Sequence, residues 1–252
     1  MNGPPRTRLD VFVETGKKRV FACAVDWPGW CRSGRTEDLA LAALAGYLPR
    51  YAAVLSRAGL VLPPEAASSL TVIERRGGTG GYTDFGVPGE VADSDRRPLT
   101  AAQGRQLAAI LQAAWAAFDQ VAATAPAQLR KGPRGGGRDT DQIVEHVIAA
   151  EAGYARKLGL RLGKPSSADP GGVAALRAGI AAALSKPADG SAPAEGSAPA
   201  EGSAPAEGSA PAEGRPASPT GWPPRYAARR IAWHVLDHAW EIEDKSVPPG
   251  GH

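Results

Sequence analysis

The fold and the candidate chemistry both depend on one stretch near the C-terminus, IAWHVLDHAWEIED at residues 231–244. Its apolar residues recur at the spacing of an amphipathic helix, and the inward stripe consists of Ile231, Val235, His238 and Ile242. His234 lies one turn before His238 on the same face. Both imidazoles are therefore expected to face the interior of a helical domain.

Three earlier segments show the same helical pattern. They are residues 100–125, residues 139 to Gly159 or Gly163, and residues 169–187. Each has a start signal, and the signals are Thr100, Asp139 with Gln142 three residues on, and Asp169 with Pro170. A fourth helix is expected to begin at Pro223 and Pro224 and to run to about Lys245. Four amphipathic segments in about 145 residues predict a four-helix bundle.

A repeat separates the third of these helices from the fourth. From Gly190 the six residues GSAPAE recur in four tandem copies. Proline disfavours helix, and the segment has no apolar surface to bury. Residues from about 187 to 222 are therefore expected to form a disordered tether.

The first third of the chain has a different pattern. Short runs rich in valine, phenylalanine and isoleucine at residues 8–15, 18–26 and 70–76 predict strands, and a single helix is expected at residues 36–59. The order ββ(β)αβ indicates a small α+β domain at residues 1–78. A linker at 79–98, the bundle at 99–245 and a tail at 246–252 complete the expected fold, an α+β domain followed by an all-α four-helix bundle.

Composition narrows the possible environments and partners. The formal net charge of +3 is too small to indicate a nucleic-acid partner. No run of about 18 apolar residues is present to cross a membrane, so a cytoplasmic location is expected. Cys23 and Cys31 lie eight residues apart, outside the CxxC spacing of redox and zinc motifs, and are expected to be reduced thiols.

The histidines suggest a metal site. The chain has only 4 histidines, and His146 lies at the edge of the apolar stripe of the second predicted helix. Two histidines from one helix and one from another can bind Zn²⁺, Ni²⁺ or Fe²⁺ and leave positions for water and substrate. Glu241 points the same way and is a candidate base, while Asp237 is a candidate to orient an imidazole. The alternative is that the histidines are hydrogen-bonded core residues and the acids are solvated charges.

Residues 99–245 resemble the DinB-like superfamily of four-helix-bundle metalloproteins. The resemblance rests on IVEHVIAAE, which contains His146, and on AWHVLDH, which contains His234 and His238. It implies that these three histidines are metal ligands, and it places Glu151 at the His-x4-Glu spacing common in that family. It also implies a transferase or isomerase that uses a low-molecular-weight thiol of the mycothiol type, or a metal-dependent hydrolase.

The N-terminal stretch DWPGWCRSGRTEDLALAALAGY resembles the HicB-like antitoxin fold over residues 8–76. The shared features are a Pro-Gly turn, a further glycine and a Thr-Glu helix start. The resemblance implies an accessory or partner-binding domain, with Trp27, Trp30 and Cys31 as core or interface residues.

A glycine-rich loop before the second predicted helix is basic. It contains Arg130, Lys131, Arg134 and Arg138. The N-terminus of the helix that follows carries partial positive charge, so a carboxylate or a thiol cofactor could bind there. A flexible solvated connection is the alternative.

Two functions follow from the sequence. The favoured one is a metal-dependent transferase or hydrolase that acts on a small molecule through His146, His234 and His238. The alternative is a non-catalytic interaction protein, in which the HicB-like domain binds a protein partner and the histidines are structural.

Overall fold

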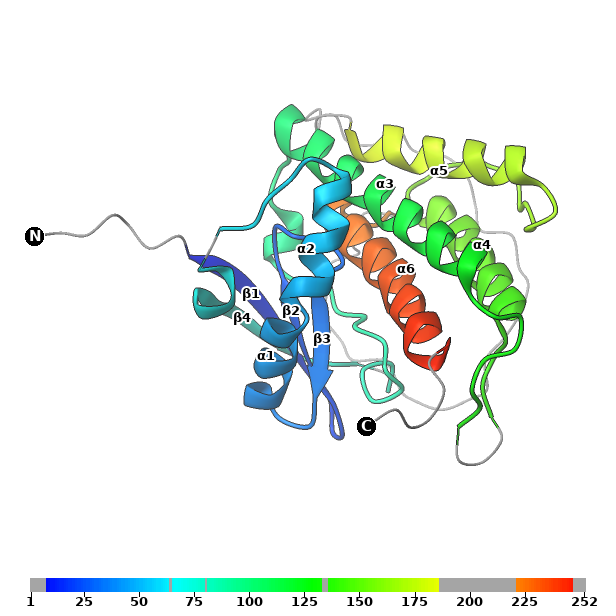
Figure 1. Ribbon diagram of the computed structural model, residues 1–252. Helices are drawn as coiled ribbons and strands as arrows, with labels where there is room; N and C mark the ends of the chain where they lie inside the picture. The colour runs from blue at the N-terminus through cyan, green and yellow to red at the C-terminus, as the bar shows by residue number, and fades with distance from the viewer. Residues whose placement is uncertain (1–7, 64, 80, 133–135, 186–220, 247–252) are drawn as a thin grey trace, which may run out of the picture.

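The computed structural model describes residues 8–246, apart from residues 64, 80, 133–135 and 186–220. It has a four-stranded sheet in its N-terminal part followed by helices, which confirms the predicted α+β class (Figure 1). The predicted tether at 187–222 lies almost wholly outside the described residues. So do Arg134 and residues 247–252 of the predicted tail.

The sheet is built around its first strand. The strands are β1 (Leu9–Thr15), β2 (Val20–Ala24), β3 (Cys31–Gly34) and β4 (Leu70–Gly77). Their order is β3-β2-β1-β4, with β1, β2 and β3 antiparallel and β4 parallel to β1. All the predicted strands are present, including the short third one. The parallel pairing requires a crossover, which the helices between β3 and β4 provide.

The helix predicted over residues 36–59 is in fact two, α1 (Glu37–Gly46) and α2 (Leu48–Arg57), bent by 48° at their junction. Thr36 caps α1 as expected, because its side chain accepts a hydrogen bond from the Leu39 amide. The prediction of one helix was wrong because of Pro49, which has no N–H to donate to the carbonyl one turn earlier.

Both faces of the sheet are covered. On one face Val11, Val13 and Ala22 belong to a core that includes Leu44 and Tyr51 of the crossover helices and continues into the C-terminal helices. The buried apolar residues of the other face include Phe12, Phe21, Cys23 and Cys31, which pack with Ala92 and Trp233. The N-terminal and C-terminal parts of the chain therefore share apolar cores.

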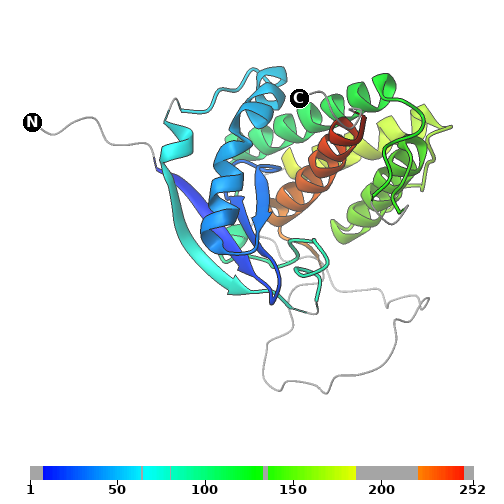
Figure 2. The same cartoon turned by 60° about the horizontal axis from the view of Figure 1, so that its bottom comes forward.

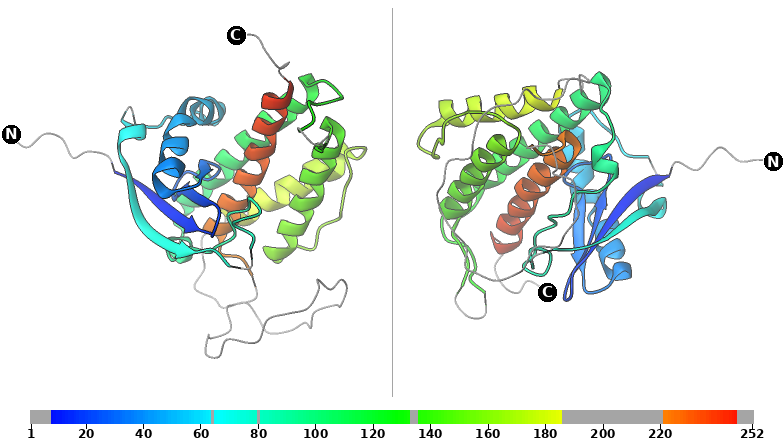
Figure 3. Two further views of the ribbon diagram at one scale, coloured as in Figure 1. Left: turned by 90° about the horizontal axis from the view of Figure 1, so that it is seen from below. Right: turned by 180° about the vertical axis from the view of Figure 1, so that it is seen from behind.

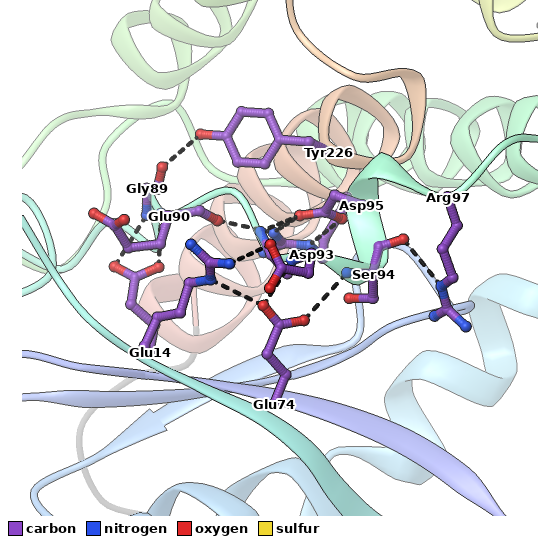
Figure 4. Close-up of polar contacts among 12 residues, drawn as sticks. Glu14, Glu74, Gly89, Glu90, Asp93, Ser94, Asp95, Arg97 and Tyr226 are labelled. Atoms are coloured by element: carbon purple, nitrogen blue, oxygen red, sulfur yellow. Dashed lines mark hydrogen bonds and ion pairs between the residues drawn. The ribbon is translucent and has the colours of Figure 1, made fainter. Parts of the chain in front are cut away.

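The segment predicted as a linker at 79–98 packs between the sheet and the last helix. The buried carboxylate of Glu14 accepts hydrogen bonds from the amides of Gly89 and Glu90 (Figure 4). Glu74 accepts from the amide of Ser94, which begins the short helical turn η2 (Ser94–Arg96), and from that of its N-cap, Asp93. Asp95 in this turn accepts hydrogen bonds from the guanidinium of Arg229 (Figure 4). Asp95 and Arg229 are 2% and 3% exposed, so their ion pair is shielded from water.

The four helices predicted after residue 99 are all present. They are α3 (Ala101–Thr124), α4 (Thr140–Lys157), α5 (Pro170–Ser185) and α6 (Pro224–Ser246). Capping boxes begin α3 and α4, which confirms the predicted cap at Thr100 and the predicted capping box at Asp139. α3 packs against α5 and α6, and α4 also contacts both. α6 runs between the sheet and α4 (Figures 2 and 3). Among the described residues, no single helix is long and apolar enough to cross a membrane. The bent pair α1 and α2 reaches the required length and apolar content only when the two helices are taken together.

We expect Asp95→Ala to lower the free energy of unfolding by about 3 kcal/mol, because it leaves the Arg229 guanidinium buried without its partner. Urea denaturation measures the change. Asp93→Ala is the matched control, since Asp93 is exposed and pairs with Arg76 at the surface, and it should cost less than about 1 kcal/mol. Equal effects of the two substitutions would show that the buried ion pair does not stabilise the docking of α6.

Candidate metal centre

Two helices bring the three internal histidines together. α6 supplies His234 and His238 one turn apart, and α4 supplies His146. The ring centroid of His146 lies 5.0 Å from each of the other two, which are 4.7 Å from one another. One potential ligand atom from each ring lies within 4.8 Å of the others. The convergence predicted from the sequence is therefore present.

The spacing of the nitrogens fits a single metal ion. Nε2 of His146 and Nε2 of His234 are 3.1 Å apart. Two nitrogens bound to one zinc at 2.0–2.1 Å in tetrahedral geometry would be separated by about 3.3 Å. A hydrogen bond between the two rings would account for this contact, but it would not account for the third ring. An all-imidazole set suits Zn²⁺, Ni²⁺ or Fe²⁺ better than the oxygen-seeking Mg²⁺ or Ca²⁺.

The surroundings of the histidines favour the neutral imidazole, which is the form that binds a metal. Burial lowers the pKa of His234 well below its ordinary value, and the neighbouring His238 lowers it further. Burial also lowers the pKa of His146, with smaller contributions from His238 and from the positive charge of Arg138. Two of the three rings are therefore ready to bind a cation without first losing a proton at neutral pH.

Glu241 positions His238. Its Oε2 lies 2.7 Å from Nδ1 of His238, which makes Nδ1–H the donor and leaves Nε2 free to bind a metal. The hydrogen bond from His238, and a second contact from Lys245, lower the pKa of Glu241 to about 2. Sequence analysis proposed Glu241 as a base. In the structure both of its oxygens have partners, so the arrangement favours an orienting role.

The other two acids predicted beside the site have different partners. Asp237 accepts a hydrogen bond from Arg32 of β3 at 3.1 Å, which ties α6 to the sheet. Glu151 is fully buried and accepts hydrogen bonds from Trp115 of α3 at 2.8 Å and from Arg177 of α5 at 3.0 Å. Within the described part of the chain, neither carboxylate has a hydrogen bond to a histidine. Asp237 instead joins α6 to β3, and Glu151 joins α4 to α3 and α5.

The basic loop is only partly available to a ligand. Lys131 forms an ion pair with Asp139 at 2.6 Å, and Arg130 donates to the backbone carbonyl of Asp244. Arg138 is exposed, and its charge contributes to the lowered pKa of both His146 and His234. Among the described residues of the loop, Arg138 is the one whose charge reaches the histidine cluster.

Sequence analysis missed two residues next to the cluster, Arg230 and Tyr154. The Arg230 guanidinium carbon lies 5.5 Å from the centre of the Tyr154 ring and 4.7 Å from that of Trp233. The Tyr154 ring in turn lies 5.7 Å from the His234 ring and perpendicular to it. The signal was in the sequence, because Arg230 precedes His234 by four residues and so shares its side of α6.

Comparison of the chain with models of known families, with curated proteins and with solved structures finds no match. The class of the protein must therefore be argued from the three-histidine cluster and its neighbours.

We expect Glu241→Gln to weaken zinc or nickel binding by about 10- to 100-fold, because removing the charged partner of a ligand histidine makes that histidine a poorer donor. Competition with a coloured chelator measures the affinity. Glu243→Gln is the matched control, since Glu243 pairs with Arg50 and lies two residues further along the helix. An unchanged affinity in Glu241→Gln would mean that the hydrogen bond to His238 has no part in metal binding.

Proposed function

We propose that this protein is an enzyme that binds one divalent transition-metal ion through His146, His234 and His238 and acts on a small molecule. The observation that carries the proposal is the convergence of three imidazoles from α4 and α6. The hydrogen bond from His238 to Glu241 supports it, because ligand histidines commonly donate their second nitrogen to a carboxylate.

The donor set favours a catalytic over a structural metal. Structural zinc sites usually have four protein ligands, whereas catalytic sites commonly have three and keep a position for water or substrate. Among the described residues, the cluster of potential ligands holds three histidines and no cysteine or carboxylate. A metal bound there would act as a Lewis acid and lower the pKa of a water or a thiol. Glu241 would hold the His238 ring in place, and Tyr154 would cover one side of His234.

The class of reaction that we propose is thiol-dependent transfer, with a low-molecular-weight thiol as co-substrate, or hydrolysis. This part of the proposal follows from the resemblance to the DinB-like superfamily. The positions of His146 on α4, the second helix after residue 99, and of the histidine pair on α6, the fourth, support the resemblance. We propose that α3 to α6 form the corresponding four-helix bundle and that the sheet with α1 and α2 is the HicB-like part. The close packing of that part against α6 supports a role in holding the metal-binding helix.

We expect the purified, untagged protein to contain about one metal ion per chain after incubation with zinc or nickel. His146→Ala, His234→Ala and His238→Ala should each lower the content to near zero, because loss of one of three ligands removes most of the affinity. Metal content is measured by inductively coupled plasma mass spectrometry after dialysis.

His252→Ala is the control, because His252 is the fourth histidine of the chain and lies outside the described residues. It should leave the metal content unchanged. A wild-type protein that retains no metal under these conditions would refute the proposed function. Circular dichroism of each variant shows whether a lost site reflects a lost fold.

A further inference from the structure

Polar side-chain atoms without a partner gather beside the metal centre. Among the described residues, three buried side-chain nitrogens or oxygens make no hydrogen bond, and they are Ser94 Oγ, Arg230 Nη1 and His234 Nδ1. Two of the three belong to residues four apart on α6, one turn from each other. Unpaired buried polar atoms are rare in folded proteins, and each one calls for a physical explanation.

Arg230 is half-buried, whereas Arg225 and Arg229 of the same helix are buried. Arg225 forms an ion pair with Asp26 at 2.9 Å, and Arg229 forms one with Asp95. Arg230 makes no salt bridge within the described part of the chain. Its guanidinium lies instead against the rings of Tyr154 and Trp233. Leaving the buried Nη1 atom without a hydrogen-bond partner is unfavourable, and contact with the two rings does not supply one.

The position of Arg230 connects it to the histidines. The Tyr154 ring touches both the guanidinium and the His234 ring, so Arg230 lies at the border of the cluster. The carboxylate of Glu241 is already bonded to His238 and Lys245.

A guanidinium is suited to one kind of ligand. Its planar fork of N–H donors matches the paired oxygens of a carboxylate or a phosphate, which accept two parallel hydrogen bonds. The Nη1 atom of this fork has no hydrogen-bond partner among the described residues, so it has a donor left for such a contact. His234 Nδ1, when it carries the proton, is a further donor in the same region.

We propose that Arg230 binds the carboxylate or phosphate group of a small anionic substrate whose reacting end lies at the histidine cluster. This inference rests on the proposed function for the reacting end, but the anion site itself does not require a metal. The substrate class would thus be organic anions, held at one end by the guanidinium and presented to the three histidines by the other.

The test is isothermal titration of the full chain with acetate, with inorganic phosphate and with neutral acetamide, at constant ionic strength. Each titration uses both chelator-treated and zinc-loaded protein. We expect acetate or phosphate to bind both forms of the wild type and acetamide to bind neither. Arg230→Gln should weaken binding of the anion by about tenfold or more, as expected for the loss of a charged hydrogen bond. The stronger of the two anions identifies the group that the site prefers.

Arg105→Gln is the matched control, since Arg105 is exposed on the first turn of α3 and loses the same charge. It should bind the anion as the wild type does. Equal binding by Arg230→Gln and the wild type, or no anion binding by the wild type in either form, would overturn the inference. Failure of the proposed function gives a different result, because the zinc content would then be near zero while the chelator-treated protein still bound the anion.

Stability provides a second readout that a structural arginine would not give. If Arg230 serves a ligand, Arg230→Gln should leave the melting temperature unchanged or raise it, because an unpaired cation is removed. Saturating anion should raise the melting temperature of the wild type more than that of the variant. A clear loss of stability in Arg230→Gln without ligand would instead assign the residue to packing and would overturn the inference.

Discussion

The packing of α6 against the sheet, α3 and α4 is the constraint on which the rest of the structure depends. One side of the helix packs against α3, and another carries Trp233, whose ring meets Phe21 of the sheet edge-on at 6.1 Å. Trp240 meets Tyr47 at the junction of α1 and α2 in the same way, at 5.1 Å. The remaining side presents His234 and His238 to α4. Because the helix is fixed from several directions, its histidines cannot rotate away from the single histidine that α4 supplies.

This arrangement explains why a small α+β part precedes the helices. The sheet is covered on one face by α1 and α2 and on the other by residues 79–98 and Trp233. Gly29, in the turn between β2 and β3, has a φ of +92° and lies so close to α6 that a Cβ there would come within 2.7 Å of Leu236. A side chain at this turn would require the Leu236 side chain to shift, and the positive φ disfavours any residue other than glycine. The N-terminal part is thus a support for the helix that carries His234 and His238, as well as a unit with its own strands.

Local patterns in the sequence predicted most of the elements and the histidine cluster. Helical spacing put His234 and His238 on one face, and capping signals at Thr100 and Asp139 gave correct helix starts. The partners of charged residues could not be predicted in the same way, because they come from distant parts of the chain. Asp237 pairs with Arg32, 205 residues away, rather than with an imidazole. Spacing along a helix shows which side a carboxylate is on, but only tertiary packing determines what it meets.

The polar and charged side chains of α6 differ in whether tertiary packing gives them a partner. The charged groups that face the sheet and residues 79–98 have partners, since Arg229 meets Asp95 and Asp237 meets Arg32. Beside the histidine cluster, Arg230 Nη1 and His234 Nδ1 have no partner among the described residues, although both atoms are buried. The buried arginines of this helix are neutralised by carboxylates, and a partner for the buried Nη1 atom of Arg230 would stabilise it as well. Polar groups left unpaired within one turn of each other, beside three converging imidazoles, are therefore better explained by a ligand than by the fold.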